Sequence, residues 1–264
     1  MEKKELMTIR DLSLRYEGKG NSPDTLALSN VNLTIREGDF ICVLGPSGCG
    51  KSTLLNIMAG LLQATSGSVE MLGEPVTGVD WKRAVVFQTP TLYPWLDVYK
   101  NVAFGPNLRG IDAKEAEARA KEYLQLVGLK DFIHAKPYEL SGGMRQRAAL
   151  ARALVNDPKM MLMDEPFGAL DAFTRNSMQD LIRKIWKETK KTVFLITHDI
   201  DEALTLGTRI IAMSPRPGRI VREAEIDFTM HMVDSQEDAR YTPEYVKLRK
   251  EILQLIAEGQ EGQI

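Results

Sequence analysis

Nine consecutive residues carry the types and the spacing that hold phosphate groups. The stretch GPSGCGKST follows the apolar run Phe40 to Leu44 and precedes a segment with helical spacing. Glycines let successive backbone N–H groups converge on phosphate oxygens, and the positive end of the following helix favours anions. The pattern GxxxxGKS therefore predicts a phosphate-binding loop, in which Lys51 reaches the β- and γ-phosphates and Ser52 offers its hydroxyl to Mg²⁺. The loop residues expected at the nucleotide are Gly45, Pro46, Ser47, Gly48, Cys49, Gly50, Lys51, Ser52 and Thr53.

An acidic pair supplies the second half of a hydrolytic site. Met160 to Met163 form an apolar strand pattern that ends in Asp164 and Glu165. Open α/β sheets bind ligands at the carboxyl ends of their strands, where this pair would lie. We expect Asp164 to hold the Mg²⁺ shell and Glu165 to orient and deprotonate an attacking water. A solvated strand end is the alternative, and the buried run before the pair together with Pro166 makes it the weaker reading.

A third motif allows two readings. Ser141, Gly142 and Gly143 in LSGGMRQ stand just before a helical run. Ser141 alone reads best as a helix N-cap, with the glycines in a tight turn. The same arrangement is also a second anion site. A chain with two phosphate-binding helix ends but only one complete phosphate-binding loop fits a head-to-tail homodimer. Each ATP would then lie between Lys51 of one copy and Ser141 of the other.

Composition limits the class of protein. The chain has 264 residues, 44% of them hydrophobic, with 34 basic and 36 acidic residues and a formal net charge of −2. It is long enough for a large core, and it has no overall basic surplus of the kind that nucleic-acid binding needs. The charged start and the absence of an apolar run of about 18 residues argue against a secretory signal or a membrane span. We expect a cytosolic protein whose Cys42 and Cys49 stay reduced.

The elements that must position these motifs alternate between strand and helix. Strands are expected at 12–16, 31–35, 40–44, 68–72, 84–88, 159–164, 192–197 and 210–213, and helices at 52–62, 174–189 and from 199. The middle is helix-rich, and Asp112 followed by Glu115 predicts a capped helix that Gly128 ends. The fold class is therefore α/β, with both halves of the chain in one sheet and an inserted helical lobe.

Three regions follow from this pattern. Residues 1–89 and 157–226 are expected to form the α/β core, 90–156 the helical subdomain and 227–264 a helical tail. Thr242-Pro243-Glu244 predicts the start of the last helix, with proline at its first position. The apolar spacing of its face predicts packing on the core rather than a free coiled coil, because the seam is short. The face consists of Tyr245, Leu248, Ile252, Leu255 and Ile256.

Taken together, the motifs resemble the nucleotide-binding subunit of an ATP-binding cassette (ABC) transporter over nearly the whole chain. GPSGCGKST is similar to the family's phosphate loop, LSGGMRQR to its signature and MMLMDEP to its acidic strand. The signature is the specific element, because other phosphate-loop ATPases lack it. The resemblance implies a RecA-type phosphate-loop core with a mostly parallel sheet, an antiparallel β edge and an inserted helical subdomain.

The resemblance also implies roles at matching positions. Tyr16 would stack on adenine, although an ordinary strand aromatic is the alternative. Gln88 in VVFQ would sense the γ-phosphate and its metal, Asp171 in GALD would cross the dimer interface, and His198 in LITHD would contact the γ-phosphate. His198 has a purely structural alternative, and His134 and His231 match nothing and are expected at the surface. Two departures from the family are Gly168, where serine is common, and the hairpin insertion GKGNSPDT, which leaves the seat of the adenine uncertain.

Further similarity points to a subgroup. YPWLDVYKNVAFG, MDEPFGALDAFTR and MSPRPGRI are similar to subunits of importers for nitrate, sulfonates and taurine. The resemblance implies a peripheral ATPase at the cytoplasmic face of the membrane, with ATP and Mg²⁺, two permease subunits and, indirectly, a solute-binding protein. In the family, the segment around Tyr93, Pro94 and Trp95 lies beside the groove that grips a permease helix, and exposed aromatics make good anchors. Trp95 as a core side chain of the lobe is an equal alternative.

Two other functions stay open at this point. A soluble small-molecule kinase would use the same phosphate loop but give Ser141, Gly142 and Gly143 no task. A family member acting on ribosomes or DNA would commonly carry two cassettes or a long coiled-coil insertion, and this chain has a single signature. Neither the transported solute nor the role of the last helix follows from these residues.

Overall fold

The computed structural model describes residues 4–18, 20, 22–229, 240 and 242–261. The chain divides into two compact units: unit 1 comprises Met1–Val79 and Lys190–Ile264, and unit 2 comprises Asp80–Thr189. His231, Lys19 and Asn21 lie outside the described residues. Within the described part, no helix has both the length and the apolar character to cross a membrane. The division into core, helical subdomain and tail expected from the sequence stays a prediction.

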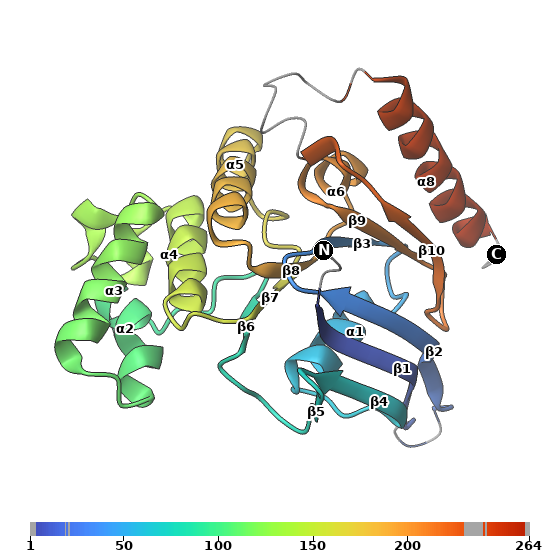
Figure 1. Ribbon diagram of the computed structural model, residues 1–264, viewed down its shortest axis with the longest axis horizontal. Helices are drawn as coiled ribbons and strands as arrows, with labels where there is room; N and C mark the ends of the chain where they lie inside the picture. Colours follow the sequence, from blue (N-terminus) through green and yellow to red (C-terminus); the bar gives the residue numbers. More distant parts are fainter. Residues whose placement is uncertain (1–3, 19, 21, 230–239, 241, 262–264) are drawn as a thin grey trace. The chain divides into compact units, whose positions relative to one another are not determined.

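Unit 1 contains an antiparallel sheet in the order β2-β1-β4-β5 (Figure 1). Its strands are β1 (Glu5–Tyr16), β2 (Thr25–Arg36), β4 (Ser66–Met71) and β5 (Glu74–Pro75). These strands form a sheet of their own, which the alternation in the sequence did not separate from the parallel sheet. β1 and β2 pair from one end to the other with several register shifts, and β1 also pairs with β4 on its other side, so β1 is an inner strand of this sheet.

The same unit holds the strands β10-β9-β3-β8 of a mostly parallel sheet. They are β3 (Phe40–Leu44), β8 (Thr192–Ile196), β9 (Arg209–Met213) and β10 (Ile220–Glu225). Every residue of β3, β8 and β9 is buried, as expected for strands covered on both faces. β3 runs parallel to both β8 and β9, so strands from the first and second halves of the chain do join here.

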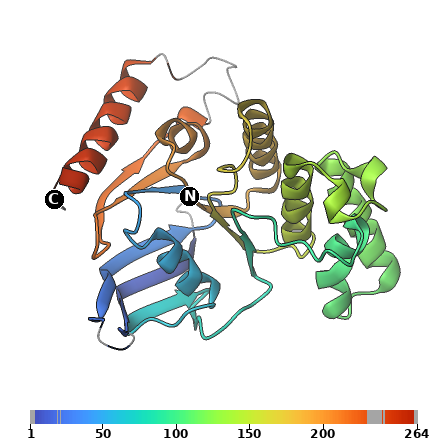
Figure 2. The ribbon, with the colours of Figure 1, turned by 180° about the vertical axis from the view of Figure 1, so that it is seen from behind.

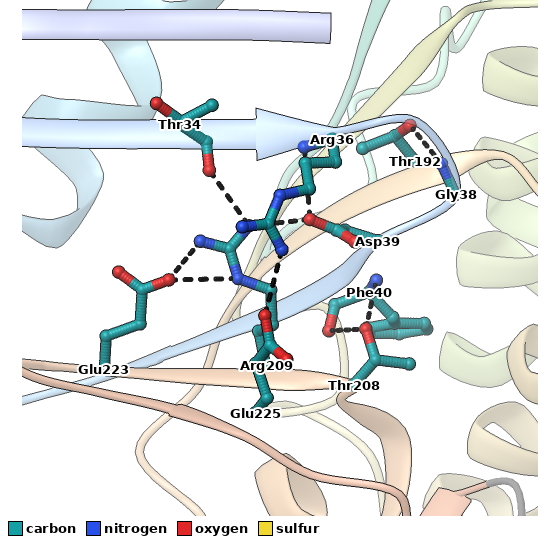
Figure 3. Close-up of polar contacts among 10 residues, drawn as sticks. All are labelled: Thr34, Arg36, Gly38, Asp39, Phe40, Thr192, Thr208, Arg209, Glu223 and Glu225. Atoms are coloured by element: carbon teal, nitrogen blue, oxygen red, sulfur yellow. Dashed lines mark hydrogen bonds and ion pairs between the residues drawn. The ribbon is translucent and has the colours of Figure 1, made fainter. Parts of the chain in front are cut away.

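A buried ion network fixes one end of this sheet (Figure 3). Arg209 on β9 donates to Asp39 at 2.6 Å and to the Thr34 carbonyl on β2 at 2.9 Å, and it also pairs with Glu223 on β10. Burial opposes the charge of Arg209, but the hydrogen bonds to Glu223 and Asp39 raise its pKa. The network connects the antiparallel strand β2 to β9 and β10, at the end of the parallel strands opposite to the phosphate loop. Its role is therefore structural.

Among its described residues, unit 1 also contains the helices α1 (Lys51–Ala59), α6 (Ile200–Leu206) and α8 (Pro243–Glu261). α8 packs against α6 and β9, with Tyr245 and Ile252 buried, as the apolar spacing predicts. Asp201 of α6 accepts hydrogen bonds from the Tyr245 hydroxyl at 2.8 Å and from two nitrogens of Arg249 at 2.8 and 3.0 Å. The last helix is therefore held on α6 by both apolar and ionic contacts.

Unit 2 pairs two parallel strands with a group of helices. The strands are β6 (Arg83–Val86) and β7 (Met160–Asp164). The helices are α2 (Val98–Leu108), α3 (Ala113–Leu126), α4 (Gly142–Leu154) and α5 (Ala172–Thr189), with short 3₁₀ turns at Lys130–Phe132 and Pro137–Glu139. Figures 1 and 2 show α2, α3 and α4 packed side by side. Asp112 caps α3 as predicted, and Gly128 follows its end with a φ of +74°.

Candidate functional site

The predicted site residues divide between the two units. Unit 1 holds the phosphate loop, Tyr16 and His198, and unit 2 holds Gln88, the Ser141–Gly143 motif and the residues from Asp164 to Asp171. Each unit thus carries its own set of candidate site residues.

The phosphate loop joins the buried strand β3 to α1, as the sequence pattern predicts. The N-cap of α1 is Gly50, in the left-handed conformation at φ +100°, and it provides no side-chain cap. By contrast, α2, α3, α4 and α6 begin at Asp97, Asp112, Ser141 and Asp199, whose side chains accept backbone N–H groups. A Cβ on Gly50 would meet Leu28 Cδ2 at 2.7 Å, so the packing here also leaves no room for a side chain. The positive end of α1 is therefore open to an external anion.

Lys51 is folded into this loop. Its ammonium nitrogen donates to the carbonyl oxygens of Gly45 at 2.8 Å and Pro46 at 3.0 Å. The Lys51 side chain is buried together with that of Cys49, whose Sγ lies 3.7 Å from the ammonium nitrogen. A positive charge held at the mouth of an open helix end favours phosphate oxygens.

Tyr16 lies at the end of β1 and contacts the helix that follows the loop. Its hydroxyl is 3.2 Å from Thr53 Oγ1, and the residue is 44% exposed. The exposed ring is available for stacking on a flat ligand, and its tip is tied to the first turn of α1. Stacking on adenine remains a prediction.

His198 reaches the same sheet edge as the phosphate loop because of strand register. Val43 on β3 pairs with Ile196 on β8, and the N–H of Thr197 donates to the Val43 carbonyl at 3.2 Å. The loop and His198 therefore both follow the carboxyl ends of neighbouring parallel strands. His198 is exposed, directly before the Asp199 cap of α6.

In unit 2 the same register rule brings Gln88 to Glu165. Val86 on β6 pairs with Met163 on β7, and Gln88 and Glu165 each lie two residues further along the chain, just past the end of the strand. The Gln88 Nε2 atom lies 3.5 Å from Glu165 Oε2. Glu165 has a φ of +44°, a left-handed backbone conformation that is strained for a non-glycine residue and that concentrates at functional sites.

The signature motif forms the start of α4. Ser141 is its N-cap, and Ser141 Oγ accepts the N–H of Met144 at 3.2 Å. The N-cap reading is therefore correct as local structure, while the second-anion reading stays a prediction, because a hydroxyl that accepts one hydrogen bond can still donate another. Gly143 is required by packing, since a Cβ there would lie 2.4 Å from Thr174 Cγ2 on α5.

Asp171 stands immediately before α5. Its carboxylate accepts the Thr174 N–H at 3.0 Å, and hydrogen bonds from the Thr174 side chain and backbone lower the pKa of Asp171. The group is therefore a stable anion at the surface of unit 2. Gly168, three residues earlier, lies close to Gln88 and Glu165, since a Cβ there would lie 3.2 Å from Gln88 Nε2 and 3.8 Å from Glu165 Oε2.

Three polar residues that sequence reasoning missed organise this part of unit 2. Buried Gln146, within the signature helix, donates to the Phe87 carbonyl at 3.3 Å, directly before Gln88. Arg152, further along α4, donates to the Thr91 carbonyl at 2.6 Å. Fully buried Asn101 binds the backbone of the turn before α2, at Tyr93, Leu96 and Asp97. Gln146 and Arg152 connect the signature helix to the segment that carries Gln88.

A cavity of about 310 Å³ lies in unit 2 between α2, α4 and β6. Tyr93 lines it, and the Tyr93 ring packs against those of Trp95 and Phe104, with centroids 5.5 and 4.8 Å apart. Trp95 is 69% exposed, which overturns the alternative that it fills the core of the lobe. Arg109 stacks over the Trp81 ring at 3.9 Å. The lining residues are Trp81, Arg83, Ala84, Val85, Tyr93, Phe104, Gly105, Leu108, Arg109, Arg152, Ala153 and Asn156.

The relatives found by sequence comparison are named as ATP-binding proteins of transporters. The sequence profile of the ABC transporter family matches residues 28–168. A taurine import ATP-binding protein of Jannaschia sp. is 48% identical over 256 residues, which cover 97% of this chain and 95% of that protein. A protein of the same name from Roseobacter denitrificans is 49% identical with the same coverage. An uncharacterized ABC transporter ATP-binding protein of Methanocaldococcus jannaschii is 47% identical over 250 residues, covering 95% of this chain and 91% of that protein.

Solved structures resemble the fold as well. The ATP-binding cassette MJ0796, in a dimeric post-hydrolysis state bound to ADP and Pi, superposes with a TM-score of 0.73 at 36% identity, covering 83% of this chain and 98% of that one. The cbiO1 protein of Clostridium perfringens, part of the cbiONQ transporter complex, gives a TM-score of 0.76 at 26% identity, covering 99% of this chain and all of that one.

Proposed function

Because the chain belongs to the ABC transporter family, we propose that it is the ATP-hydrolysing subunit of an importer for a small sulfonate-like solute. The observation that carries this proposal is the match over 97% of the chain to taurine import ATP-binding proteins. It favours an importer over the soluble kinase and over family members that act on ribosomes or DNA. Nitrate and other small anions are the alternative solutes.

The nucleotide would be held by unit 1. Phosphate oxygens bind at the open N-terminus of α1. Lys51 turns its ammonium group from the Gly45 and Pro46 carbonyls towards the β- and γ-phosphates. Tyr16 supports the adenine ring, and His198, at the same sheet edge, contacts the γ-phosphate.

Hydrolysis would depend on Glu165. Its carboxylate positions a water for attack on the γ-phosphorus and accepts a proton from it, while the side-chain amide of Gln88 holds the carboxylate in place. Ser52 of unit 1 and, in unit 2, Gln88 and Asp164 each carry an oxygen atom of the kind that a hard cation prefers, so the donor types suit Mg²⁺. When bound, Mg²⁺ neutralises charge on the phosphate oxygens.

Two copies would share each ATP. Ser141, Gly142 and Gly143 present a hydroxyl and backbone amides at the positive end of α4, which suits the γ-phosphate bound by a second copy. The exposed anion at Asp171 would cross the same interface. The dimeric cassette with ADP and Pi is a structural precedent for the arrangement.

The cavity of unit 2 would receive the permease. Its apolar wall around Tyr93 and Phe104, and the exposed ring of Trp95 beside it, suit a short amphipathic helix. Through Arg152 and Gln146, the cavity is connected to the backbone on either side of Gln88. Nucleotide state and permease position would be coupled by this connection. Two permease subunits, one for each copy, would place the dimer at the cytoplasmic face of the membrane, with a binding protein delivering the solute.

Uptake by cells tests the proposal directly. The gene is deleted in the source organism, and uptake of labelled taurine, an alkanesulfonate and nitrate is measured before and after complementation. We expect loss of uptake of one of these solutes, restored by the wild-type gene and not by the Glu165→Gln gene. Unchanged uptake of all three solutes after deletion would contradict an importer of this class.

A further inference from the structure

The hairpin within the segment MSPRPGRI, to which no role has been assigned so far, lies against the phosphate loop. It spans residues 214–219, between β9 and β10, and belongs to unit 1 together with the loop. A Cβ on Gly218 would lie 2.0 Å from the Cys49 carbonyl oxygen, and a Cβ on Gly45 would lie 3.0 Å from the Met213 carbonyl oxygen. Backbone therefore lies against backbone at the start of the loop and at its middle residue Cys49, and the contact at Gly218 leaves no room for a side chain.

The hairpin is also fastened to the neighbouring strand β2. The Gly218 N–H donates to the Ala27 carbonyl at 2.9 Å, and the Gly218 carbonyl accepts the Ser29 N–H at 3.0 Å. Inside the hairpin, the Ser214 N–H donates to the Arg219 carbonyl at 2.9 Å, and the Arg219 N–H donates to Ser214 Oγ at 3.0 Å. These contacts fix the hairpin as a rigid wall beside the loop.

From this wall Arg216 reaches the tip of the loop. Its Nε and Nη2 atoms both lie 3.4 Å from the Gly48 carbonyl oxygen. Gly48 has a φ of +75°, and a Cβ there would lie 3.3 Å from Arg216 Nη2. Two donors of one cation thus converge on a single carbonyl, an arrangement that a guanidinium makes and an ammonium does not.

Two cations therefore hold the carbonyl groups of the loop. Lys51 binds those of Gly45 and Pro46, and Arg216 binds that of Gly48. A peptide unit is planar, so fixing the Gly48 carbonyl also fixes the direction of the Cys49 N–H at its other end. The conformation of the loop is thereby set before a phosphate arrives, and ordering it then costs less binding free energy.

We propose that Arg216 is a positioning residue that holds the phosphate loop ready for nucleotide. The inference rests on the proposed role of the loop in binding ATP and adds to it a residue from outside the loop and the signature. Arg216 acts on the Gly48 carbonyl and takes no part in the chemical step. Its removal should therefore weaken ATP binding and leave the turnover of bound ATP unchanged.

The test compares Arg216→Ala, Arg216→Lys and Arg219→Ala in the full chain. Arg219 is an exposed arginine of the same hairpin, so its variant changes the net charge equally. For Arg216→Ala we expect the KM for ATP and the dissociation constant of a fluorescent ATP analogue to rise about three- to tenfold, with kcat within about twofold of wild type. Arg216→Lys should recover part of the loss, and Arg219→Ala should match wild type.

Two results would overturn the inference. One is an equal KM for Arg216→Ala and Arg219→Ala. The other is a fall in kcat and in the thermal midpoint with KM unchanged, which is the result expected for a residue that only stabilises the fold. Lys51→Ala is the reference for the loop itself. If Lys51→Ala binds the analogue as wild type does, the loop is not the nucleotide site and both proposals fail; if it binds weakly while Arg216→Ala binds normally, this inference alone fails.

Discussion

The side-chain nitrogen of Gln88 lies 3.5 Å from a carboxylate oxygen of Glu165. This contact joins residues 77 positions apart because β6 and β7 run parallel, with Val86 opposite Met163. In unit 1, the parallel pairing of β3 with β8 brings His198 to the edge that carries the phosphate loop in the same way. Parallel strands in register thus gather the functional residues of each unit at carboxyl ends, where open α/β sheets bind ligands.

Replacement of Glu165 by Gln should nearly stop ATP turnover and preserve ATP binding. The amide keeps the size and the contact with Gln88 but cannot accept the proton of the attacking water. We expect kcat to fall about 10²- to 10⁴-fold, measured by phosphate release, with an unchanged dissociation constant for ATP. Glu188→Gln on the exposed face of α5 is the control and should retain full turnover. Equal turnover in both variants would remove Glu165 from the mechanism.

Ser141→Asp separates the two roles of Ser141. Aspartate is an equally good N-cap and favours the positive end of α4, so the thermal midpoint should be unchanged or slightly higher. A carboxylate placed against a triphosphate is repelled, so cooperative ATP turnover should fall at least tenfold. The reverse exchange, Asp112→Ser at the cap of α3, should alter neither quantity appreciably. Full turnover by Ser141→Asp would leave Ser141 with the cap role only.

The contact between α8 and α6 should give a defined pH dependence. Hydrogen bonds from Arg249, and then from Tyr245, lower the pKa of Asp201. A carboxyl group with a lowered folded-state pKa stabilises the protein above its unfolded pKa of about 3.9, and this contribution is lost as the pH falls through the folded-state pKa. Because both partners are over 40% exposed, we expect about 1 kcal/mol or less.

Urea unfolding of wild type and Asp201→Asn measures this contribution. The deficit of Asp201→Asn should be the same at pH 7 and pH 5 and should shrink below about pH 4. Glu117→Gln removes an exposed pair with Lys121 on α3 and serves as the control, with a smaller deficit expected. A deficit of Asp201→Asn that grows in acid would have the wrong sign for this account.

Trp95→Ala should weaken the complex with the permease and leave the isolated subunit unaffected. The ring is 69% exposed and packs on Tyr93, which lines the cavity of unit 2. After co-expression with the neighbouring permease genes, we expect several-fold less permease to co-purify, because buried aromatic anchors dominate such interfaces. Tyr138→Ala, an exposed aromatic outside the lining of the cavity, is the matched control. Equal recovery with both variants would contradict the docking site.

Local patterns in the sequence predicted part of this structure and missed another part for identifiable reasons. The β3 strand and the glycine loop were predictable because burial on both faces and a fixed spacing leave a continuous signal. β1 and β2 were found only from Leu12 and Val31 onward, since Asp11 and Asn30 adopt positive φ values and the register shifts around Leu12 break the alternation. Which strands form a separate sheet depends on pairing between distant residues, which alternation does not encode.

The residues of the candidate site also divide into those that the sequence indicates and those that only the fold shows. Lys51, Asp164 and Glu165 stand in motifs whose spacing is set by the chemistry, so the sequence indicates them. Buried Asn101 and Gln146 look like polar residues on amphipathic helices, and only the fold shows that their side chains hold backbone groups. Arg216 stands in the segment MSPRPGRI, whose resemblance gives no hint of its contact, because the partner Gly48 is 168 residues away.

Sharing of ATP between two copies is the central claim, and the mass of the Glu165→Gln protein in solution tests it most directly. The mass is measured by light scattering on a sizing column, with and without saturating Mg·ATP, and nucleotide binding is confirmed in the same sample. We predict a shift from the 29.6 kDa of one chain to twice that value on adding Mg·ATP, abolished by Ser141→Asp in the same background. A species that binds ATP and still has the mass of one chain would contradict the shared site.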